Sequence, residues 1–334
     1  EDDFITPKLW WLTQGAQSQD SDKATDPSQS GLWGMGRVIQ TEHPELNCQL
    51  LDLDSSLDLK TSLLDCVNHL KRQDDDSSEN QQLLRNHQRY VGRLCRLAKP
   101  QEEKVIEIDY SGTQIITGGL SGIGYALCQY LVEQGATSIA LMARSDASLE
   151  QKEQFKLWAK DKIRVCDYQV DVSDKRVLEE GLGHIQKAQG NIKGIFHLAG
   201  VLDDATLLNQ SEASFEKVFA AKVYGSWNLH ELTQSLKIEL NHFVLFSSVS
   251  SMIGSGGQAN YAAANGFMDG LSLKRRQLDL PGLSLNWGLF SDVGMGLDVL
   301  ERYVKRGIES ITVTEGMASI KQLLGSTINS SQVM

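Results

Sequence analysis

The sequence predicts an α/β protein whose main part is a doubly wound parallel sheet, preceded by a smaller α/β lobe. From residue 105 onward, short apolar runs alternate regularly with amphipathic helical segments. A glycine-rich turn joins the first of these runs to the helical segment after it. Strands that alternate with helices favour a parallel sheet with right-handed crossovers, and the ligand site of such a sheet lies beyond the carboxyl ends of its strands.

The first hundred residues contain less regular α/β material. Two polar stretches, 17–30 and 73–82, are predicted to be solvated loops. The elements expected around them are a short apolar run at 9–12, a helix over 31–42, a strand over 48–53 and a helix over 59–70.

The regular part supplies six predicted strands. They are 114–117, 138–143, 165–170, 194–199, 243–247 and 283–286. The change of pattern divides the chain into a lobe over 1–104 and a nucleotide-binding unit over 105–334. The full length of 334 residues is enough for two domains, each with a sizeable core.

Composition and charge exclude several classes of protein. No stretch approaches the roughly 20 apolar residues of a membrane helix. The acidic start at 1–3 lacks the basic end and apolar run of a signal peptide, so we expect a cytoplasmic protein. A net charge of −11 argues against general nucleic-acid binding. The five cysteines are scattered and form no C-x-x-C pair, which predicts buried, reduced thiols and no metal site.

The glycine-rich turn follows the predicted strand 114–117 and opens the helical pattern 125–134. This context distinguishes a dinucleotide fingerprint from a chance run of glycines. Glycines let the backbone turn tightly and approach a pyrophosphate, whose charge meets the helix N-terminus. The alternative is an ordinary strand-to-helix turn. The cofactor contacts predicted here are Thr117, Gly118, Gly119, Leu120, Ser121, Gly122, Ile123 and Gly124.

The end of the next strand indicates which dinucleotide would bind. Arg144 and Ser145 suit the 2′-phosphate of NADPH, although the nearby Asp146 keeps NAD as an alternative and the arginine could be a surface residue. Asp171 and Val172, after the third strand, are predicted to contact the adenine ring. A helix N-cap is the alternative interpretation for Asp171.

Four side chains further along the chain make chemical sense together. Ser248 would donate a hydrogen bond to a substrate carbonyl, and Tyr261 would supply the proton. Lys222 would lower the pKa of the tyrosine and hold the nicotinamide ribose of the cofactor. Asn265, one helical turn after Tyr261, would lie on the same face and hold a water in a proton relay.

Each of these residues also has a simpler interpretation. Ser248 could belong to a polar loop, Tyr261 could anchor a helix, and Lys222 could be solvated. The joint pattern in a nucleotide-binding sheet outweighs these alternatives. His197 is interpreted as a structural residue at a strand end. A serine–histidine hydrolase is disfavoured because no G-x-S-x-G elbow accompanies Ser248.

Taken together, these segments resemble the ketoreductase domain of a modular polyketide synthase, within the short-chain dehydrogenase/reductase superfamily. The resemblance spans almost the whole chain. It rests on TGGLSGIG at 117–124, HLAGVLDD at 197–204, KVYG at 222–225, FSS at 246–248, GSGGQANY at 254–261 and NWG at 286–288. LWGMGR at 32–37 and EHPE at 42–45 resemble the family's accessory structural subdomain, a Rossmann-like lobe without its own cofactor. The resemblance implies that this non-catalytic lobe lacks its first strands and that the chain is a piece of a larger polypeptide.

By position, Tyr261 is similar to the family's proton donor, Ser248 to its carbonyl-orienting serine, and Lys222 and Asn265 to its lysine and asparagine. A lysine upstream of the tyrosine and an asparagine after it reverse the order common in short-chain reductases. The intact set implies an active, NADPH-dependent reductase. Its substrate would be a β-ketoacyl thioester on the phosphopantetheine of an acyl carrier protein, among neighbouring synthase domains. Further cofactor contacts are predicted at Ala199 and Gly200.

The resemblance also implies a stereochemical outcome. The motif Leu202, Asp203, Asp204 marks B-type domains, which give the D-configured β-hydroxyl. A-type domains carry a tryptophan where this chain has Ile253, and epimerising B-type domains carry a proline where it has Ala263. The alternative interpretation of the two aspartates is a pair of helix N-caps.

A mobile lid is implied over 290–307, where Phe290 and Met295 would face the substrate and Leu297 could touch the acyl chain. Gln258 is a further predicted substrate residue. The alternative for the lid is a surface helix. Two other functions stay open: a free-standing reductase of small ketones, and a catalytically silent scaffold domain of a synthase.

Overall fold

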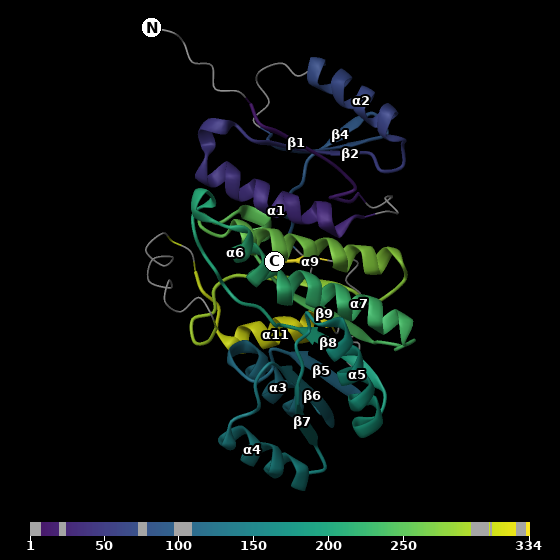
Figure 1. Ribbon diagram of the computed structural model, residues 1–334, viewed down its shortest axis with the longest axis vertical. Helices are drawn as coiled ribbons and strands as arrows, with labels where there is room; N and C mark the ends of the chain where they lie inside the picture. The colour runs from purple at the N-terminus through teal and green to yellow at the C-terminus, as the bar shows by residue number, and fades with distance from the viewer. Residues whose placement is uncertain are drawn as a thin grey trace.

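The computed structural model describes residues 8–19, 25–72, 79–96, 109–294, 307, 309–324 and 332–334. These residues form two α/β units, one built on a seven-stranded sheet and one on a four-stranded sheet (Figure 1). The predicted boundary at 104/105 lies outside the described residues. Among the described helices, none is long and apolar enough to cross a membrane.

The larger unit contains the predicted doubly wound parallel sheet. Its strands are β5 (Thr113–Thr117), β6 (Ser138–Ala143), β7 (Arg164–Gln169), β8 (Ile192–His197), β9 (His242–Ser248), β10 (Leu283–Trp287) and β11 (Gln332–Val333). Their spatial order is β11-β10-β9-β8-β5-β6-β7, and every pair is parallel. The strand order reverses between β5 and β8, so the ligand crevice of such a sheet lies at the carboxyl ends of these two strands.

Helices cover both faces of this sheet (Figure 1). Neighbouring residues of a strand point to opposite faces of the sheet. Ile115 and Ile116 of β5 therefore belong to two different apolar cores, one on each face. One core includes α5 (Lys175–Gln189), α7 (Ser226–Ser235) and α9 (Ala259–Gln277); the other includes α3 (Gly122–Glu133), α4 (Leu149–Lys160) and α11 (Val313–Leu324). The shorter elements are η2 (Leu207–Asn209), α6 (Glu212–Phe219), the π-helical turn η3 (Ala220–Gly225) and α8 (Ser250–Ile253).

The smaller unit is a Rossmann-like lobe built on a four-stranded sheet. Its strands are β1 (Trp10–Gln14), β2 (Gln49–Leu53), β3 (Gln81–Arg85) and β4 (Gln88–Tyr90), of which the first three are parallel. Its helices are α1 (Pro27–Glu42), η1 (Pro44–Leu46) and α2 (Leu59–Arg72). Neighbouring residues of β2 belong to two different cores. Leu50 lies in the core under α1, and Leu51 lies in a second core together with Cys66 of α2.

The prediction of solvated loops over 17–30 and 73–82 was partly wrong. Helix α1 begins at Pro27 rather than at residue 31, because Asp26 caps it by accepting a hydrogen bond from the Ser28 backbone N–H at 3.0 Å. Gln82 lies in strand β3 and is 1 % exposed, since its side-chain amide donates to the Glu79 carbonyl at 2.6 Å. Hydrogen bonding, rather than apolar character, lets these polar residues enter regular structure. Residues 20–24 and 73–78 lie outside the described part of the chain.

A buried ion pair occupies the carboxyl end of the smaller sheet. Arg85 Nη2 lies 2.6 Å from Asp52 Oδ2, and both side chains are almost fully buried. The other carboxylate oxygen accepts hydrogen bonds from the Thr13 hydroxyl at 2.6 Å and the Ala16 backbone N–H at 2.8 Å. These contacts join β1, β2 and β3 at one end of the smaller sheet.

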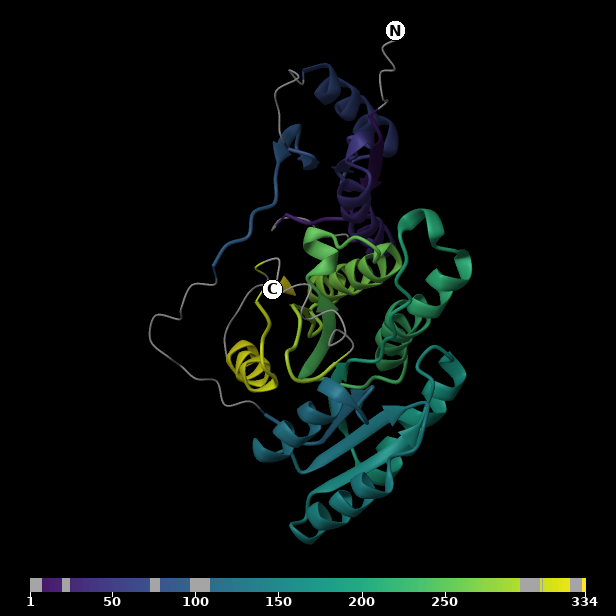
Figure 2. The ribbon, with the colours of Figure 1, turned by 90° about the vertical axis from the view of Figure 1, so that its left-hand side faces the viewer.

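The two units meet where α1 lies along α9 (Figures 1 and 2). Small residues make this contact close: a Cβ added to Gly34 would lie 2.1 Å from the Ala262 carbonyl oxygen. A Cβ on Gly266 of α9 would lie 2.8 Å from the Ser30 carbonyl oxygen. The smaller lobe therefore packs directly on the backbone of the helix that carries Tyr261.

Candidate functional site

The glycine-rich turn lies at the carboxyl end of β5, beside β8. Gly118 has φ +68°, and a Cβ added there would lie 3.0 Å from the Ala199 backbone nitrogen. A Cβ on Gly124 would lie 2.2 Å from the Gly118 carbonyl oxygen. Glycine is therefore required at both positions, and it brings the first turn of α3 close to the ends of β5 and β8.

The amino end of α3 fits a phosphate group. Ser121 precedes the helix in an extended conformation, and its side chain makes no capping hydrogen bond. The first N–H groups of a helix lack partners within the helix, and the helix dipole adds positive potential there. Gly294 returns to this turn, with its Cα 3.7 Å from the position that a Cβ on Gly122 would take. The turn thus fits the pyrophosphate of a dinucleotide.

His197 ties the turn to the neighbouring segments. Its Nδ1 lies 2.7 Å from the Thr117 hydroxyl, and its Nε2 lies 3.0 Å from the Ala221 carbonyl oxygen. Burial lowers the pKa of His197 to about 3, with Lys222 adding to the shift, so the ring is neutral at physiological pH. The Thr117 hydroxyl also accepts from the Leu198 and Ala199 backbone N–H groups at 3.2 Å. His197 is a structural residue that joins β5, β8 and η3.

The residues predicted to choose the cofactor follow β6 on an exposed turn. Arg144, Ser145 and Asp146 are all exposed. The Arg144 carbonyl accepts from the Gln169 side chain at 3.0 Å, which fixes the backbone of the turn to β7. One cation and one carboxylate thus stand at the strand end where the adenosine ribose of a dinucleotide binds.

Asp171 does not cap helix α5, so that alternative interpretation is wrong. Its carboxylate accepts from the backbone N–H and the hydroxyl of Ser173, at 2.9 and 2.6 Å. The N-cap is Asp174, which accepts from the first backbone N–H groups of α5. Val172 is 4 % exposed and packs in the core.

Lys222 lies on the π-helical turn η3 and is 3 % exposed. Its Nζ donates to the Phe246 carbonyl oxygen at 3.1 Å and lies 5.1 Å from the ring centroid of Tyr261. A Cβ on Gly200 would lie 2.9 Å from Lys222 Cε, so this glycine leaves room for the lysine side chain. Local π-helical turns are frequent at functional sites.

Asn265 and Tyr261 lie one turn apart in α9. Asn265 Nδ2 donates to the Tyr261 backbone carbonyl at 2.8 Å, and its buried Oδ1 accepts no hydrogen bond within the described part of the chain. Ser248 ends β9, and the adjacent Ser247 hydroxyl donates to the Asn265 carbonyl at 3.3 Å. Together with Lys222, all four predicted catalytic residues lie around the carboxyl end of β9.

Burial governs the charges of this group. It lowers the pKa of Lys222 to about 7, against the opposing effect of the Asp269 carboxylate. It raises the pKa of Tyr261 to about 12, although an interaction with the Asn265 side chain opposes the shift. Burial is therefore the largest influence on the pKa of Tyr261, and the lowering of this pKa by Lys222 stays a prediction.

The segment 202–204 lies against the amino end of α9. Asp203 Oδ1 lies 2.9 Å from Lys217 Nζ, and Asp204 Oδ2 accepts from Gln258 Nε2 at 2.9 Å. The next helices, η2 and α6, have their caps further along the chain, so the two aspartates are not helix caps. The motif is instead joined to the residues that immediately precede Tyr261.

Phe290 is buried among other side chains of the larger unit. It is 4 % exposed, and its ring lies 5.4 Å from that of Trp287. A Cβ on Gly316 of α11 would lie 2.7 Å from the Phe290 ring, so the contact is tight. Phe290 is therefore a buried packing residue in this structure, and its predicted place in a substrate lid stays a prediction. Residues 295–306 of that predicted lid, with Met295 and Leu297, lie outside the described residues.

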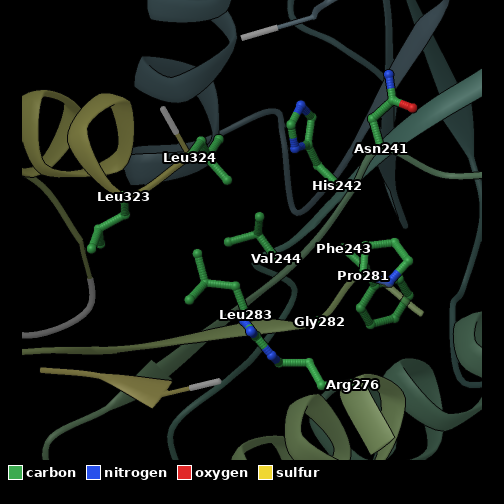
Figure 3. Close-up of a pocket in the computed structure, with 10 residues that line it drawn as sticks. All are labelled: Asn241, His242, Phe243, Val244, Arg276, Pro281, Gly282, Leu283, Leu323 and Leu324. Atoms are coloured by element: carbon green, nitrogen blue, oxygen red, sulfur yellow. The ribbon is translucent and has the colours of Figure 1, made fainter. Parts of the chain in front are cut away.

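A pocket of about 170 Å³ lies at the opposite end of the strands (Figure 3). It is lined by Asn241, His242, Phe243, Val244, Arg276, Pro281, Gly282, Leu283, Leu323 and Leu324. These residues include the amino ends of β9 and β10, whereas Ser248 ends β9. The pocket therefore contains none of the predicted site residues.

Three charged residues support the site without having been predicted. Arg37 of α1 donates to the Ser251 carbonyl, just after the predicted catalytic serine. Asp269 of α9 accepts from the Ser251 and Ser284 hydroxyls, each at 2.6 Å. Glu42 at the end of α1 accepts from two loops beside the site. Arg37 and Glu42 lie in the segments that resemble the accessory lobe, but their contacts span long sequence separations that no local pattern reveals.

The sheet order, the glycine-rich turn and the grouped polar residues define a Rossmann-like α/β protein with a dinucleotide site. Residues 112–292 match the KR domain model, and residues 1–94 match the model of the Rossmann fold domain of the polyketide synthase extender module SpnB. The chain therefore belongs to the ketoreductase domain family of modular polyketide synthases. Members of this oxidoreductase family use a nicotinamide cofactor.

Individual relatives agree with this assignment. A phenolphthiocerol/phthiocerol polyketide synthase of Mycobacterium tuberculosis is 32 % identical over 321 residues, which are 96 % of this chain and 17 % of the relative. Polyketide synthase GfsA of Streptomyces halstedii is 35 % identical over 297 residues, 87 % of this chain and 4 % of the relative. The chain thus spans a small part of these much longer proteins.

Solved ketoreductases have the same fold. A structure of A-type ketoreductases from a modular polyketide synthase superposes with a TM-score of 0.86 at 31 % identity, covering 98 % of this chain and 68 % of the other. The first ketoreductase of the tylosin polyketide synthase superposes with a TM-score of 0.78 at 32 % identity, covering 95 % and 67 %.

Proposed function

We propose that this chain reduces a β-ketoacyl thioester to a D-β-hydroxyacyl thioester with NADPH, and that the substrate is carried by an acyl carrier protein. The observation that carries the proposal is the grouping of Lys222, Tyr261, Asn265 and Ser248 beside the glycine-rich turn. The intact group argues against a silent scaffold domain.

The four side chains have complementary roles in this reaction. NADPH, when bound, supplies the hydride. The Ser248 hydroxyl donates a hydrogen bond to the substrate carbonyl oxygen, and the Tyr261 hydroxyl transfers its proton to that oxygen as negative charge develops there. The Lys222 ammonium stabilises the phenolate that remains. The buried Asn265 Oδ1 accepts a hydrogen bond from a water that returns a proton to the tyrosine.

The cofactor would bind across the ends of β5, β6 and β8. Residues 117–124 would surround the pyrophosphate, and the guanidinium of Arg144 would pair with the 2′-phosphate, assisted by Ser145. Asp171 and Val172 would contact the adenine ring, and Ala199 and Gly200 would lie along the nicotinamide half. Lys222 would also hold the nicotinamide ribose.

The D-configuration is proposed from the segment 202–204. This segment is attached to the residues just before Tyr261 through the hydrogen bond between Asp204 and Gln258. It can therefore determine from which side the acyl chain enters and which carbonyl face meets the hydride. The similarity to A-type structures concerns the fold as a whole, whereas the proposal rests on the hydrogen bond between this motif and the residue before α9.

The test is NADPH consumption by the purified chain with a β-ketoacyl thioester, followed by chiral separation of the product. We expect oxidation of NADPH and a D-hydroxyl. Tyr261→Phe should abolish reduction while NADPH binding persists, because the variant lacks the proton donor. Tyr90→Phe is the matched control, since that tyrosine lies on β4 of the smaller lobe and donates to Gln88.

Each other result contradicts a named part of the proposal. An L-hydroxyl product would overturn the stereochemical assignment alone. Full turnover by Tyr261→Phe would overturn the mechanism. NADPH binding without turnover would favour a silent scaffold, and equal activity on small free ketones would favour a free-standing reductase.

A further inference from the structure

Glu42 connects the smaller lobe to two separate loops of the candidate active site. It is the last residue of α1 and is partly buried. Its Oε1 accepts a hydrogen bond from the Gly257 backbone N–H at 2.6 Å, and its Oε2 accepts one from the Leu207 backbone N–H at 2.7 Å. One carboxylate therefore joins three segments that are distant in the sequence.

The two loops lead directly to the proposed chemistry. Gly257 has φ +88° and lies four residues before Tyr261, in the turn that precedes α9. Leu207 lies three residues after Asp204. Between them, the Ala205 backbone N–H donates to the Gly257 carbonyl at 2.9 Å. Movement of either loop would change the distance between the tyrosine and the segment 202–204.

We propose that Glu42 is a positioning residue, which holds the Tyr261 helix and the segment 202–204 at the separation needed for a single substrate orientation. This inference rests on the proposed reduction and adds to it a role for the accessory lobe. The lobe then contributes to rate and stereochemical purity, as well as to stability.

The chemistry of a carboxylate suits this role. An ionised carboxylate is an acceptor at both oxygens, and both partners here are N–H donors. Glutamine at the same position keeps one acceptor but sets its amide NH₂ group against the other backbone N–H. The substitution Glu42→Gln therefore releases one loop while preserving the size of the side chain.

A matched control lies three residues further along the chain. Glu45 is in the same lobe, its side chain is 59 % exposed, and its partner is His43. Glu45→Gln makes the same chemical change without touching either loop. Comparing the two variants separates the loss of the loop contacts from the loss of one negative charge on the lobe.

The experiment measures kcat, KM for NADPH, the enantiomer ratio of the product and amide hydrogen exchange over 203–208 and 255–261. For Glu42→Gln we expect a fall in kcat of roughly 10-fold, since one charge-assisted hydrogen bond is lost. We also expect a measurable share of the opposite enantiomer, faster exchange in the two loops and an unchanged KM for NADPH. Glu45→Gln should match the wild type in all four measurements.

An unchanged kcat and enantiomer ratio in Glu42→Gln would overturn the inference, even if the chain became less stable. If Glu42→Gln fails to fold, Glu42→Asp is the second variant, because it keeps the carboxylate but shortens the side chain. An unchanged enantiomer ratio in Glu42→Asp would also overturn the inference. If the wild type reduces no substrate, the proposed function fails, whereas hydrogen exchange still decides whether Glu42 fixes the loops.

Discussion

The ammonium group of Lys222 lies over the ring of Tyr261, 5.1 Å from its centroid, and donates to the Phe246 carbonyl at 3.1 Å. The two side chains come from η3 and α9, so they meet only in the folded chain. Burial disfavours the charged form of each, which lowers the pKa of the lysine and raises that of the tyrosine. A phenolate at Tyr261 and an ammonium at Lys222 would stabilise each other.

The lowered pKa of Lys222 predicts opposite pH trends for activity and stability. If the ammonium is needed, kcat/KM of the free enzyme should fall as pH rises through about 7, while Tyr261, with a pKa near 12, stays protonated. Below pH 7 the lysine is charged in both the folded and the unfolded chain, so the folded chain bears the full free-energy cost of burying a charge. Between about 7 and 10.5 the folded chain binds fewer protons, and stability should rise with pH.

Two variants check these trends. Lys222→Arg keeps its charge, so the fall in kcat/KM above pH 7 should disappear even if the overall rate is lower. Lys222→Met lacks the ionisable group, so the difference in unfolding free energy between wild type and variant should change across the same pH window, by about 1.4 kcal/mol per unit of pKa shift. If the unfolding free energies of wild type and Lys222→Met changed with pH in parallel, the lowered pKa of Lys222 would be contradicted.

Arg144 should control the choice between the two nicotinamide cofactors. Arg144→Ala removes the proposed partner of the 2′-phosphate, so KM for NADPH should rise roughly 10- to 100-fold while KM for NADH changes little. Steady-state kinetics with both cofactors measure this. Arg176→Ala is the control, because that exposed arginine pairs with Glu180 on α5. Equal losses with both cofactors would mean that Arg144 supports the turn rather than the phosphate.

Six of the seven described strands of the larger sheet were predicted, because most of these strands are short apolar runs. Ile115 and Ile116, for example, are both fully buried, in different cores. The smaller lobe was predicted less well, since polar residues such as Gln82 and Ser30 are buried there through hydrogen bonds. The local pattern of apolar residues does not reveal such hydrogen bonds.

The candidate site was predicted from motifs, whereas its supports were not. Tyr261 and Asn265 share one helix, so their spacing is local information. Arg37 and Glu42 reach the site from another lobe, and their partners are fixed by tertiary packing alone. The raised pKa of Tyr261 was not predicted for the same reason, because segments distant in the sequence bury its hydroxyl.

The contact between α1 and α9 should be intolerant of added volume. In Gly34→Ala the new Cβ would lie 2.1 Å from the Ala262 carbonyl oxygen, which must move the helices apart. We expect a loss of roughly 1–3 kcal/mol in unfolding free energy and a lower kcat, because α9 carries Tyr261.

The control for this prediction is Gly183→Ala on α5, since nothing lies within 4 Å of its added Cβ. Urea unfolding should show that this variant is more stable than the wild type by roughly 0.5–1 kcal/mol. If both variants changed stability by similar amounts, close contact between α1 and α9 would not be the cause of the lost stability.

Asp269 should support the proposed catalytic serine through its hydrogen bonds. Its carboxylate accepts from the Ser251 and Ser284 hydroxyls and from Asn286 Nδ2, which also donates to the Ser248 carbonyl at 3.2 Å. Asp269→Asn would turn an amide NH₂ group toward these donors, because an amide has one acceptor oxygen where the carboxylate has two.

The expected result is a loss of roughly 1–3 kcal/mol in unfolding free energy, from the unsatisfied buried donors. The loop that begins at Ser248 would also lose its fixed position, so kcat should fall more than KM changes. Asp279→Asn, an exposed position just after α9, should leave both quantities near the wild-type values. A stable Asp269→Asn variant with full kcat would show that the serine is held by the strand alone. A destabilised variant with full kcat would limit the role of Asp269 to folding.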